Sequence, residues 1–396
     1  MKKISRAIGL LLSFAMIASL SACLKEEDAS SDSQSTQITS ENKEPDSESG
    51  ENENSESGET IGGTSEAPSS GDSEQDEPTQ KPEEEAAVGS VAWYLQNGYG
   101  ALFNDPYLKN GINILSVDGS ESKAIGFGSS QGAPAWTFAQ WHSKYDLRTY
   151  ESLKYAQKGT AFELSSYGAT GSAGNYIPAK VIKIDSKIPS IYMGLNAEVE
   201  FEKPKEDGEG WPHTLLSQDF FGALVHVSEQ KELKAHMEYT VTKFDDKMNG
   251  QADAAKHCAQ LVWYVTLQNR NPESAGYGQY VWFGFNLWDN RHSGGVCPEY
   301  AAQDLGKEDA TKAFIYQPAS DVFFEAKRMP TVGEQAKIEF DFLPTAKQAF
   351  ELAKSRGYLP QTNWDDIYIG SMNFGWEVTG IYNVGVQIDT VGIYYK

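Results

Sequence analysis

The aromatic residues of this chain are distributed very unevenly along its length. Residues 24–88 contain none, whereas residues 89–396 hold 46 of the 47 Phe, Tyr and Trp side chains. The aromatic-free stretch is rich in Ser, Glu, Asp, Gly and Pro, and its 20 acids and 3 lysines give a net charge of −17. Such a composition cannot bury enough apolar surface to offset the conformational entropy lost on folding. We therefore predict a disordered linker over residues 23–88 and a folded domain over residues 89–396.

The charge of the linker indicates what it does. Like charges extend a chain, and an ideal flexible chain of this length would already span about 45 Å. The simplest function is reach, and the alternative is an acidic arm that binds a partner. Residues 89–396 account for only −9 of the total charge of −23. Because no basic patch interleaved with aromatic residues is visible, we do not expect nucleic acid as a partner.

Residues 1–22 have the pattern of a secretory signal. Three basic residues precede an apolar run that ends at Leu20 and is too short to span a bilayer as a lone helix. The segment Leu20-Ser21-Ala22-Cys23 resembles the lipobox of bacterial lipoproteins. The resemblance implies cleavage after Ala22, lipidation of Cys23 and anchoring to the extracytoplasmic face of the cell membrane. The alternative is an ordinary signal peptide that is cut at the same bond.

The folded domain shows many short strand patterns and one clear helix pattern. Val, Ile, Phe, Tyr and Trp recur in short segments separated by Gly, Asn, Asp and Pro. The predicted strands cover residues 179–184, 199–202, 222–227, 237–244, 261–268, 280–288, 337–342, 368–378 and 384–395. Ala346–Arg356 predicts a helix, with Thr345 as its cap and Gly357 at its end. This pattern favours an all-β antiparallel sandwich, jelly-roll-like, in a single domain; a division near residues 245–256 is the alternative.

The segment 280–288 is the most informative of these strands, because its two faces differ in character. Successive side chains of a strand point to opposite faces. One face is uninterrupted apolar core, made of Val281, Phe283, Phe285 and Leu287. The other face combines aromatic rings with an amide and a gap at a glycine, in the order Tyr280, Trp282, Gly284, Asn286 and Trp288. A merely solvated face would instead carry Lys, Thr or Glu.

A sugar fits such a surface, since its apolar C–H face lies on flat rings while its hydroxyls bond the polar groups around them. Two other predicted strands have polar faces, with Tyr264, Thr266 and Gln268 on one and Ser371, Asn373 and Glu377 on the other. If these strands pair side by side, one sheet face becomes aromatic and polar together. The predicted ligand-binding residues are Tyr280, Trp282, Asn286, Trp288, Asp289 and Arg291. The alternative is that a second layer of the protein covers the rings.

The C-terminal segment 386–395 resembles the closing strand of jelly-roll carbohydrate-binding modules. In some of those families the acid that matches Asp389 helps to hold a structural calcium ion. No Asp-x-Asp-x-Asp loop accompanies Asp389 here, so a role as an ordinary strand carboxylate is the alternative. We otherwise predict no metal and no cofactor, because the six histidines show no ligand spacing.

Two features could support catalysis. Glu339 and Asp341 share one strand face and resemble part of the Glu-x-Asp strand of laminarinase-like glycoside hydrolases. The further Glu of that pattern is missing, because Leu343 and Pro344 follow, and a solvated strand face is the alternative. Arg291 and His292 could together serve a polysaccharide lyase, with Arg291 neutralising a uronate; a brace formed by Asp289 and Arg291 is the alternative.

Cys258 and Cys297 are the cysteines that remain beside Cys23. An exported location permits a disulfide between them, and whether it forms stays open at this point. The prediction as a whole is a lipid-anchored cell-surface protein that binds a polysaccharide, with no catalytic residue assigned. One alternative is a glycoside hydrolase or polysaccharide lyase on a jelly-roll scaffold. Another is a surface adhesin or protein-interaction module.

Overall fold

A computed structural model describes residues 86–127, 132–148, 154–170, 176–188, 190–220, 222, 224–305 and 310–396. The signal, the lipobox with Cys23 and the acidic linker lie outside the described residues. The described residues belong to one compact unit, which extends from residue 85 to residue 396. No helix among them is long and apolar enough to cross a membrane.

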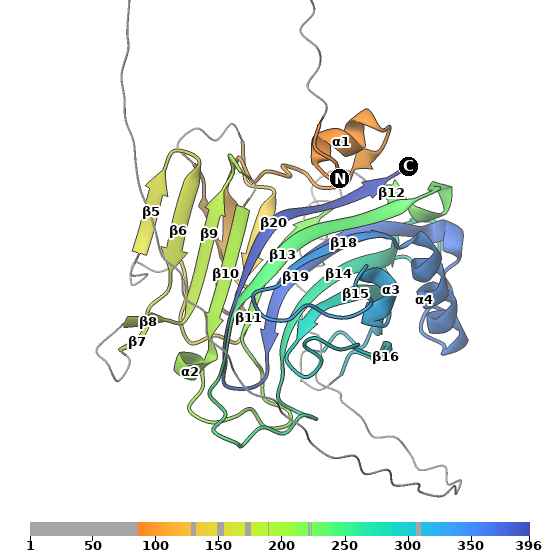
Figure 1. The fold of residues 1–396 in the computed structure, drawn as a ribbon. Coiled ribbons are helices and arrows are strands. Elements are labelled where there is room, and N and C mark those ends of the chain that lie inside the picture. Colours follow the sequence, from red (N-terminus) through yellow and green to blue (C-terminus); the bar gives the residue numbers. More distant parts are fainter. Residues whose placement is uncertain are drawn as a thin grey trace, which may run out of the picture. The chain divides into compact units, whose positions relative to one another are not determined.

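Two large sheets make up the unit (Figure 1). Sheet A has eight strands in the order β18-β13-β20-β10-β9-β6-β5, with β1 pairing with β20. Its strands are β1 (Gly100–Ala101), β5 (Lys154–Lys158), β6 (Ala161–Ser165), β9 (Lys180–Asp185), β10 (Ser190–Asn196), β13 (Leu233–Asp246), β18 (Gln335–Asp341) and β20 (Tyr382–Tyr395).

Sheet B has ten strands in the order β16-β17-β15-β14-β19-β11-β4-β2-β3, with β12 pairing with β19. Its strands are β2 (Ile112–Leu115), β3 (Ser122–Ile125), β4 (Trp136–Ala139), β11 (His213–Asp219), β12 (Val225–His226), β14 (Ala259–Asn269), β15 (Tyr280–Asp289), β16 (Tyr300–Gln303), β17 (Phe314–Gln317) and β19 (Ile367–Val378). The pairs β2–β4 and β15–β17 are parallel and the other neighbours are antiparallel. A small third sheet joins β7 (Gly168–Thr170) to β8 (Tyr176–Pro178).

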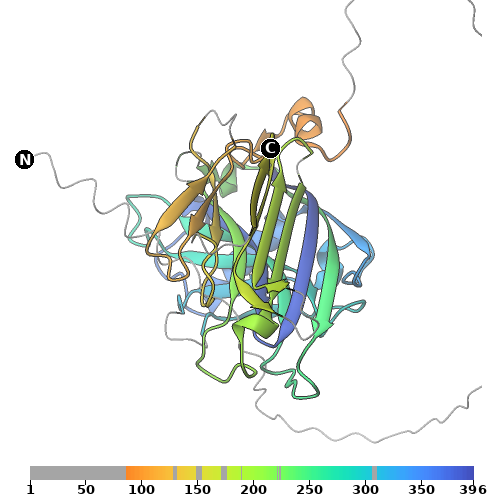
Figure 2. The ribbon, with the colours of Figure 1, turned by 90° about the vertical axis from the view of Figure 1, so that its left-hand side faces the viewer.

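The hydrophobic core lies between the two sheets, whose backbones Figure 2 shows from a second direction. Sheet B contributes alternate residues of its central strands, such as Trp263 on β14, Phe285 on β15 and Phe374 on β19. Sheet A contributes residues such as Met193 and Val386 in the same way. This alternation explains the sandwich, since each sheet buries one face against the other. The predicted all-β sandwich is therefore confirmed.

The helices are short and lie at the margins of the sheets. They are α1 (Val91–Gln96), α2 (Ala197–Glu200), α3 (Ser320–Phe323) and α4 (Leu343–Ser355), with two 3₁₀ turns, η2 (Val227–Glu229) and η3 (Trp364–Asp366). The predicted helix is present as α4, but it begins earlier than its Thr345 cap would place it. Pro344 occupies its first turn, and the Asp341 carboxylate accepts the Leu343 N–H at 3.2 Å. The backbone donor at this end is thus satisfied from the preceding strand.

Eight of the nine predicted strands correspond to observed ones, although in segment 222–227 only β12 is a strand. The prediction of a strand over residues 199–202 is wrong. This region forms the single turn of α2, which turns the Glu200 side chain inward. Glu200 accepts a hydrogen bond from Ser143 at 2.5 Å and lies 3.3 Å from the ammonium of Lys180. Glu200 is therefore a buried, paired residue and does not lie on a solvated strand face.

The buried Lys180–Glu200 pair fixes the loop that follows β4. Lys180 is fully buried and also donates to Ser143 Oγ and to the Tyr145 carbonyl. Burial lowers the pKa of Lys180, and the adjacent Glu200 carboxylate opposes that shift. Both charges are compensated, as a buried ion pair requires.

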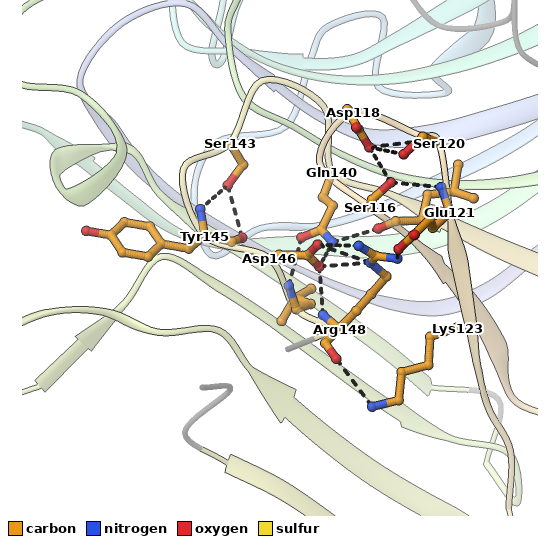
Figure 3. A network of polar contacts seen from close by, with 12 residues as sticks. Ser116, Asp118, Ser120, Glu121, Lys123, Gln140, Ser143, Tyr145, Asp146 and Arg148 are labelled. Atoms are coloured by element: carbon orange, nitrogen blue, oxygen red, sulfur yellow. Dashed lines mark hydrogen bonds and ion pairs between the residues drawn. The ribbon is translucent and has the colours of Figure 1, made fainter. Parts of the chain in front are cut away.

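The same loop is held from its other side by the network in Figure 3. The Gln140 amide donates to the Leu115 carbonyl at 2.7 Å and to Asp146 at 2.8 Å, and its oxygen accepts the Leu147 N–H. Arg148 bonds Asp146 through two nitrogens and also reaches Glu121 at 3.0 Å. Both the oxygen and the nitrogen of the buried Gln140 amide thus have hydrogen-bond partners, which is the usual state of a buried amide.

The segment that contains α1 covers part of the outer face of sheet A. The Tyr94 ring stacks on Tyr394 with 3.6 Å between ring centroids, and its hydroxyl donates to Glu339. His236 Nδ1 lies 2.7 Å from the other oxygen of Glu339, and His236 Nε2 lies 3.0 Å from the Thr390 hydroxyl. We call Tyr94, His236, Glu339 and Thr390 the clip. The clip fastens the first described residues of the chain onto β13, β18 and β20.

Candidate functional site

The outer face of sheet B, which points away from the core, carries the candidate site. Register places the side chains of neighbouring strands opposite one another on this face. It consists of His213, Ser217 and Asp219 on β11; Ser371, Asn373 and Glu377 on β19; Gln260, Val262, Tyr264, Thr266 and Gln268 on β14; and Tyr280, Trp282, Gly284, Asn286 and Asp289 on β15. The condition stated in the sequence analysis is met, since β14 pairs with β15 on one side and with β19 on the other.

The aromatic part of this face forms a small hydrophobic cluster of its own. Tyr264, Trp282, Val262 and Ile315 are buried together, separately from the main core. The Tyr264 ring lies over Gly284, where any side chain would come within 2.4 Å of it. The gap that the sequence shows at Gly284 is therefore filled by Tyr264, and it is not free for a ligand. Only a glycine permits this close approach of ring and strand.

Trp282 is covered by other parts of the protein, which is the alternative that the sequence analysis gave for the rings of this face. Its side chain is 3% exposed, Tyr300 and Ala313 pack against its cluster, and its Nε1 donates to Thr311 at 3.4 Å. Tyr280, at the start of β15, meets Trp282 edge to face and is half-buried. Tyr280 is thus more accessible than the buried rings of Tyr264 and Trp282.

Trp288 does not lie on the outer face, which corrects the predicted side of this residue. The register shifts between Leu261 and Val262, so that Trp288 pairs with Leu261 and Asn286 pairs with Val262. This bulge turns Trp288 toward the core, where it meets Trp376 edge to face. A bulge of one residue exchanges the two faces of a strand, and the simple alternation rule cannot foresee it.

One row across the outer face is strongly polar. Glu377 stands opposite Gln260, and Gln260 stands opposite Asp289 on the next strand. The Gln260 amide donates to Asp289 at 2.8 Å. On the other side, Glu377 lies 3.7 Å from His213 Nε2 and accepts from the indole of Trp211 at 3.4 Å. Two carboxylates therefore flank one amide, and all three side chains are at least 95% buried.

Asp289 and Arg291 form the loop brace that the sequence analysis gave as an alternative. Arg291 bonds both oxygens of the Asp289 carboxylate, at 2.9 and 2.6 Å, and donates to the Ala254 carbonyl at 3.1 Å. Burial by itself would raise the pKa of Asp289, but the bonds from Arg291 and Gln260 hold that pKa below its ordinary value. The carboxylate is ionised and fully engaged, so neither residue is placed for a uronate.

Three amide oxygens of the outer face have no hydrogen-bond partner among the described residues. They are Oε1 of Gln268, Oδ1 of Asn286 and Oδ1 of Asn373, on three adjacent strands. Their residues are 8%, 3% and 7% exposed. A buried acceptor that lacks a partner costs about 1–3 kcal/mol, so each such group in a folded protein calls for an explanation. The nitrogens of Gln268 and Asn286 are used, since they donate to the Gly278 carbonyl and to Cys297 Sγ.

The acids Glu339 and Asp341 are used for structure. Glu339 belongs to the clip, and Asp341 accepts from the Leu233 and Leu343 N–H groups. Burial opposes the ionisation of Glu339, yet the bonds from His236 and Tyr94 keep its pKa below the ordinary value. These two carboxylates lie on sheet A, away from the outer face of sheet B. They do not form a catalytic pair with any acid of that face.

The cysteines and the candidate calcium residue lie in different parts of the fold. Cys258 and Cys297 are both buried and are not joined to each other by a disulfide. Cys258 lies beside Thr379, whereas Cys297 lies beside Asn286. Asp389 lies within β20. Over the described ranges no group of three His, Cys, Asp or Glu side chains is arranged to hold a metal ion.

The part of the face that β11 supplies was not predicted from the sequence. His213, Ser217 and Asp219 alternate along this strand, but Leu215, Leu216 and the following Phe residues gave no clear period. Gln260 was also missed, because it precedes the predicted strand start at Leu261. A polar residue at alternate spacing just before a strong strand is the signal that would have found it.

Comparison with solved structures finds sandwiches of similar strand arrangement. A family 12 xyloglucanase from Bacillus licheniformis is 11% identical, with 65% of this chain and 99% of the other covered and a TM-score of 0.36. An endoglucanase from Rhodothermus marinus is 11% identical, with coverages of 60% and 92% and a TM-score of 0.33. The family 11 xylanase from Neocallimastix patriciarum is 9% identical, with coverages of 63% and 97% and a TM-score of 0.31.

The similarity to these proteins concerns the β-jelly roll alone. No protein-family model matches this chain. No curated protein matches it either. By its own strand order the described part of the chain is a β-sandwich of two large sheets. Its similarity to glycoside hydrolases of families 12 and 11 is at low identity.

Proposed function

We propose that this protein binds a polysaccharide through the outer face of sheet B. The observation that carries the proposal is the character of that face, on which buried amides with unused oxygens stand beside a packed aromatic cluster. An outward sheet face without a ligand role would carry solvated Lys, Thr or Glu side chains. Convergent polar groups beside aromatic rings are instead typical of a small-molecule or sugar site.

Binding is favoured over cleavage by the residue that stands opposite Glu377. Retaining glycosidases need two carboxyl groups about 5–5.5 Å apart, and directly opposed residues on neighbouring strands would supply this separation. Here the residue opposite Glu377 is Gln260, whose amide cannot act as a nucleophile or as a general acid. The position at which hydrolysis would need a carboxylic acid therefore carries a neutral amide.

The test is retention of the full-length protein on a panel of polysaccharides, with an assay for reducing ends on the same samples. We expect retention without products, and we expect that Trp282→Ala, which removes the centre of the aromatic cluster, abolishes retention. Gln348→Ala on the exposed side of α4 is the matched control and should leave retention unchanged. Retention that survives Trp282→Ala would show that the glycan is bound elsewhere, and no retention at all would contradict the proposal.

A second candidate function is glycoside hydrolysis, which the Glu377–Gln260–Asp289 row favours. Inverting glycosidases use two carboxyl groups about 6.5–9.5 Å apart, and two strand spacings of about 4.7–4.9 Å each come to the upper limit of this range. Glu377 would be the general acid and Asp289 the general base. Asp289 would first have to be released from Arg291, which is why binding comes first. The solved structures named above are a xyloglucanase, an endoglucanase and a xylanase, the class to which this function would correspond.

Hydrolysis has a test of its own in Glu377→Gln, which keeps the shape of the side chain and removes its acidity. The expectation from the binding proposal is that neither the wild-type protein nor the variant releases reducing ends. Release by the wild type that disappears in Glu377→Gln would establish cleavage and reverse the order of the two functions.

We further propose that the protein works at the outer surface of the cell, anchored by a lipid on Cys23. The support is the signal pattern that ends in Leu20-Ser21-Ala22-Cys23. Metabolic labelling with a radioactive fatty acid should label the wild-type protein and should not label Cys23→Ala. Equal labelling of both proteins would contradict lipidation at this residue.

A further inference from the structure

We infer that the outer face of sheet B selects uncharged glycans, because what it offers to a ligand is hydrogen-bond acceptors. This inference rests on the proposed function and names the chemical class of its ligand. Three buried amide atoms on the face lack a hydrogen-bond partner among the described residues, and all three are oxygens, those of Gln268, Asn286 and Asn373; each of these residues is more than nine-tenths buried. An acceptor oxygen is satisfied by a donor, and the donors of a neutral sugar are its hydroxyl groups.

The basic groups that a carboxylated or sulfated glycan would need each lie beside a carboxylate of the protein. Arg291 holds both oxygens of Asp289. Arg270 lies 3.8 Å from Asp219, at the opposite end of the face. His213 lies 3.7 Å from Glu377. Among the described residues on or beside this face, each of these basic groups therefore faces a carboxylate of the protein.

The charges on the face also favour a neutral glycan over a charged one. Asp219, Asp289 and Glu377 place carboxylates on β11, β15 and β19, and the nearby Asp304 is 99% buried beside Trp282's partner Thr311. Because the basic groups beside the face already lie next to these carboxylates, the charge of an anionic glycan would stay uncompensated in a partly desolvated setting, where charge interactions are stronger than in water. A neutral chain avoids this cost and supplies the missing donors. Specificity of this kind combines a satisfied attraction with a built-in repulsion.

The test compares polysaccharides of the same backbone with and without charge. The probes are hydroxyethyl cellulose against carboxymethyl cellulose and highly methyl-esterified pectin against de-esterified pectin, together with galactomannan and alginate. We expect the full-length protein to bind a neutral member at least tenfold more tightly than its charged counterpart, at both low and moderate salt. Tighter binding of a charged member, weakened by added salt, would overturn the inference while leaving the proposed function intact. Binding to none of the probes would overturn both.

Two variants of Asn373 separate an acceptor from a donor at this position. Asn373→Asp keeps acceptor oxygens and loses the amide donor, whereas Asn373→Leu loses both. Loss of one hydrogen bond changes affinity about 3- to 10-fold, and we expect Asn373→Leu to show a loss of this size while Asn373→Asp retains most of the binding. Equal losses in the two variants would show that the amide donor is what the ligand uses, against the inference.

Each variant is first compared with the wild type by thermal unfolding, so that misfolded protein is not scored as a loss of binding. If Asn373→Asp does not fold, Gln268→Glu and Gln268→Leu provide the same comparison on β14. The control remains Gln348→Ala, which lies on α4 and should bind every probe as the wild type does.

Discussion

The two sheets of this sandwich treat the polar groups on their outer faces in opposite ways. On sheet A both oxygens of Glu339 have partners, from Tyr94 and from His236, and the segment around α1 covers them. On sheet B the oxygens of Asn286 and Asn373 are more deeply buried and have none among the described residues. The first arrangement stabilises the fold, and the second costs stability in the absence of a ligand. Satisfied polar groups indicate structure, and unsatisfied ones indicate the site.

The largest expected effect comes from removing the ring that fastens the clip. Tyr94→Ala deletes a 99% buried aromatic side chain that stacks on Tyr394 and bonds Glu339. We expect the free energy of unfolding to fall by about 3–5 kcal/mol, as measured by urea denaturation. Retention on a polysaccharide should be unchanged at temperatures where the variant is folded. A loss of retention by the folded variant would erase the distinction between the two faces.

A smaller loss of stability is expected from Glu339→Gln. The amide keeps the shape but replaces two charge-assisted hydrogen bonds with weaker ones, and because the side chain is 38% exposed the loss should be only about 1 kcal/mol. The same denaturation experiment measures it. An unfolding free energy equal to that of the wild type would show that the clip is not held by this carboxylate.

The clip also predicts a dependence of stability on pH. The pKa of Glu339 is lower in the folded protein than its ordinary value of 4.5, so the ionised carboxylate stabilises the fold at any pH above that value. This contribution is lost as the pH falls below 4.5 and through the lowered pKa. Unfolding free energies measured from pH 7 to pH 3 should therefore fall less steeply in Glu339→Gln than in the wild type. Identical slopes would contradict the assignment.

On the outer face of sheet B, replacing a polar residue should weaken binding more than it lowers the free energy of unfolding. Asn373→Leu removes a buried oxygen that has no partner, so we expect a change in unfolding free energy within about 1 kcal/mol in either direction. Retention on the polysaccharide should nevertheless weaken. A loss of stability of several kcal/mol would mean that Asn373 is a structural residue like Glu339, and that the comparison fails.

The smallest expected effect concerns Asp219, at the end of this face. Burial raises its pKa to about 6 against the opposing influence of Arg270. A carboxyl group whose pKa is raised on folding stabilises the fold when protonated, so this contribution is present below pH 3.8 and is lost as the pH rises through 6. Asp219→Asn should therefore gain a few tenths of a kcal/mol relative to the wild type at pH 7 and nothing at pH 3.5. Thermal unfolding at the two pH values would detect the difference.

Much of the fold could be predicted because the strongest strands alternate cleanly. The pattern of 280–288 and 368–378 predicts β15 and β19, and the polar faces of β14 and β19 do meet. The errors have local physical causes. A bulge at Leu287 turns Trp288 to the core, and the buried Lys180 draws Glu200 into a helical turn where alternation predicts a strand. Neither cause is visible without knowing which strands lie side by side.

The candidate site was only partly predictable for a related reason. Trp282 and Asn286 lie on the predicted face, but the Tyr264 ring that fills the gap at Gly284 comes from another strand. The Asp289–Arg291 pair could be read as a ligand site or as a brace, and only the bonds to both carboxylate oxygens decide for the brace. The oxygens of Asn286 and Asn373 are unused because no donor among the described residues reaches them. No sequence pattern shows this.

The most direct test of the central claim is hydrogen–deuterium exchange of the full-length protein with and without the neutral polysaccharide that retains it best. The account predicts that the glycan protects backbone amides in β14, β15, β19 and β11, and that β13 and β18 behind the clip exchange as before. Protection confined to β13 and β18, or a protein that no polysaccharide retains, would contradict the claim that the outer face of sheet B binds a glycan.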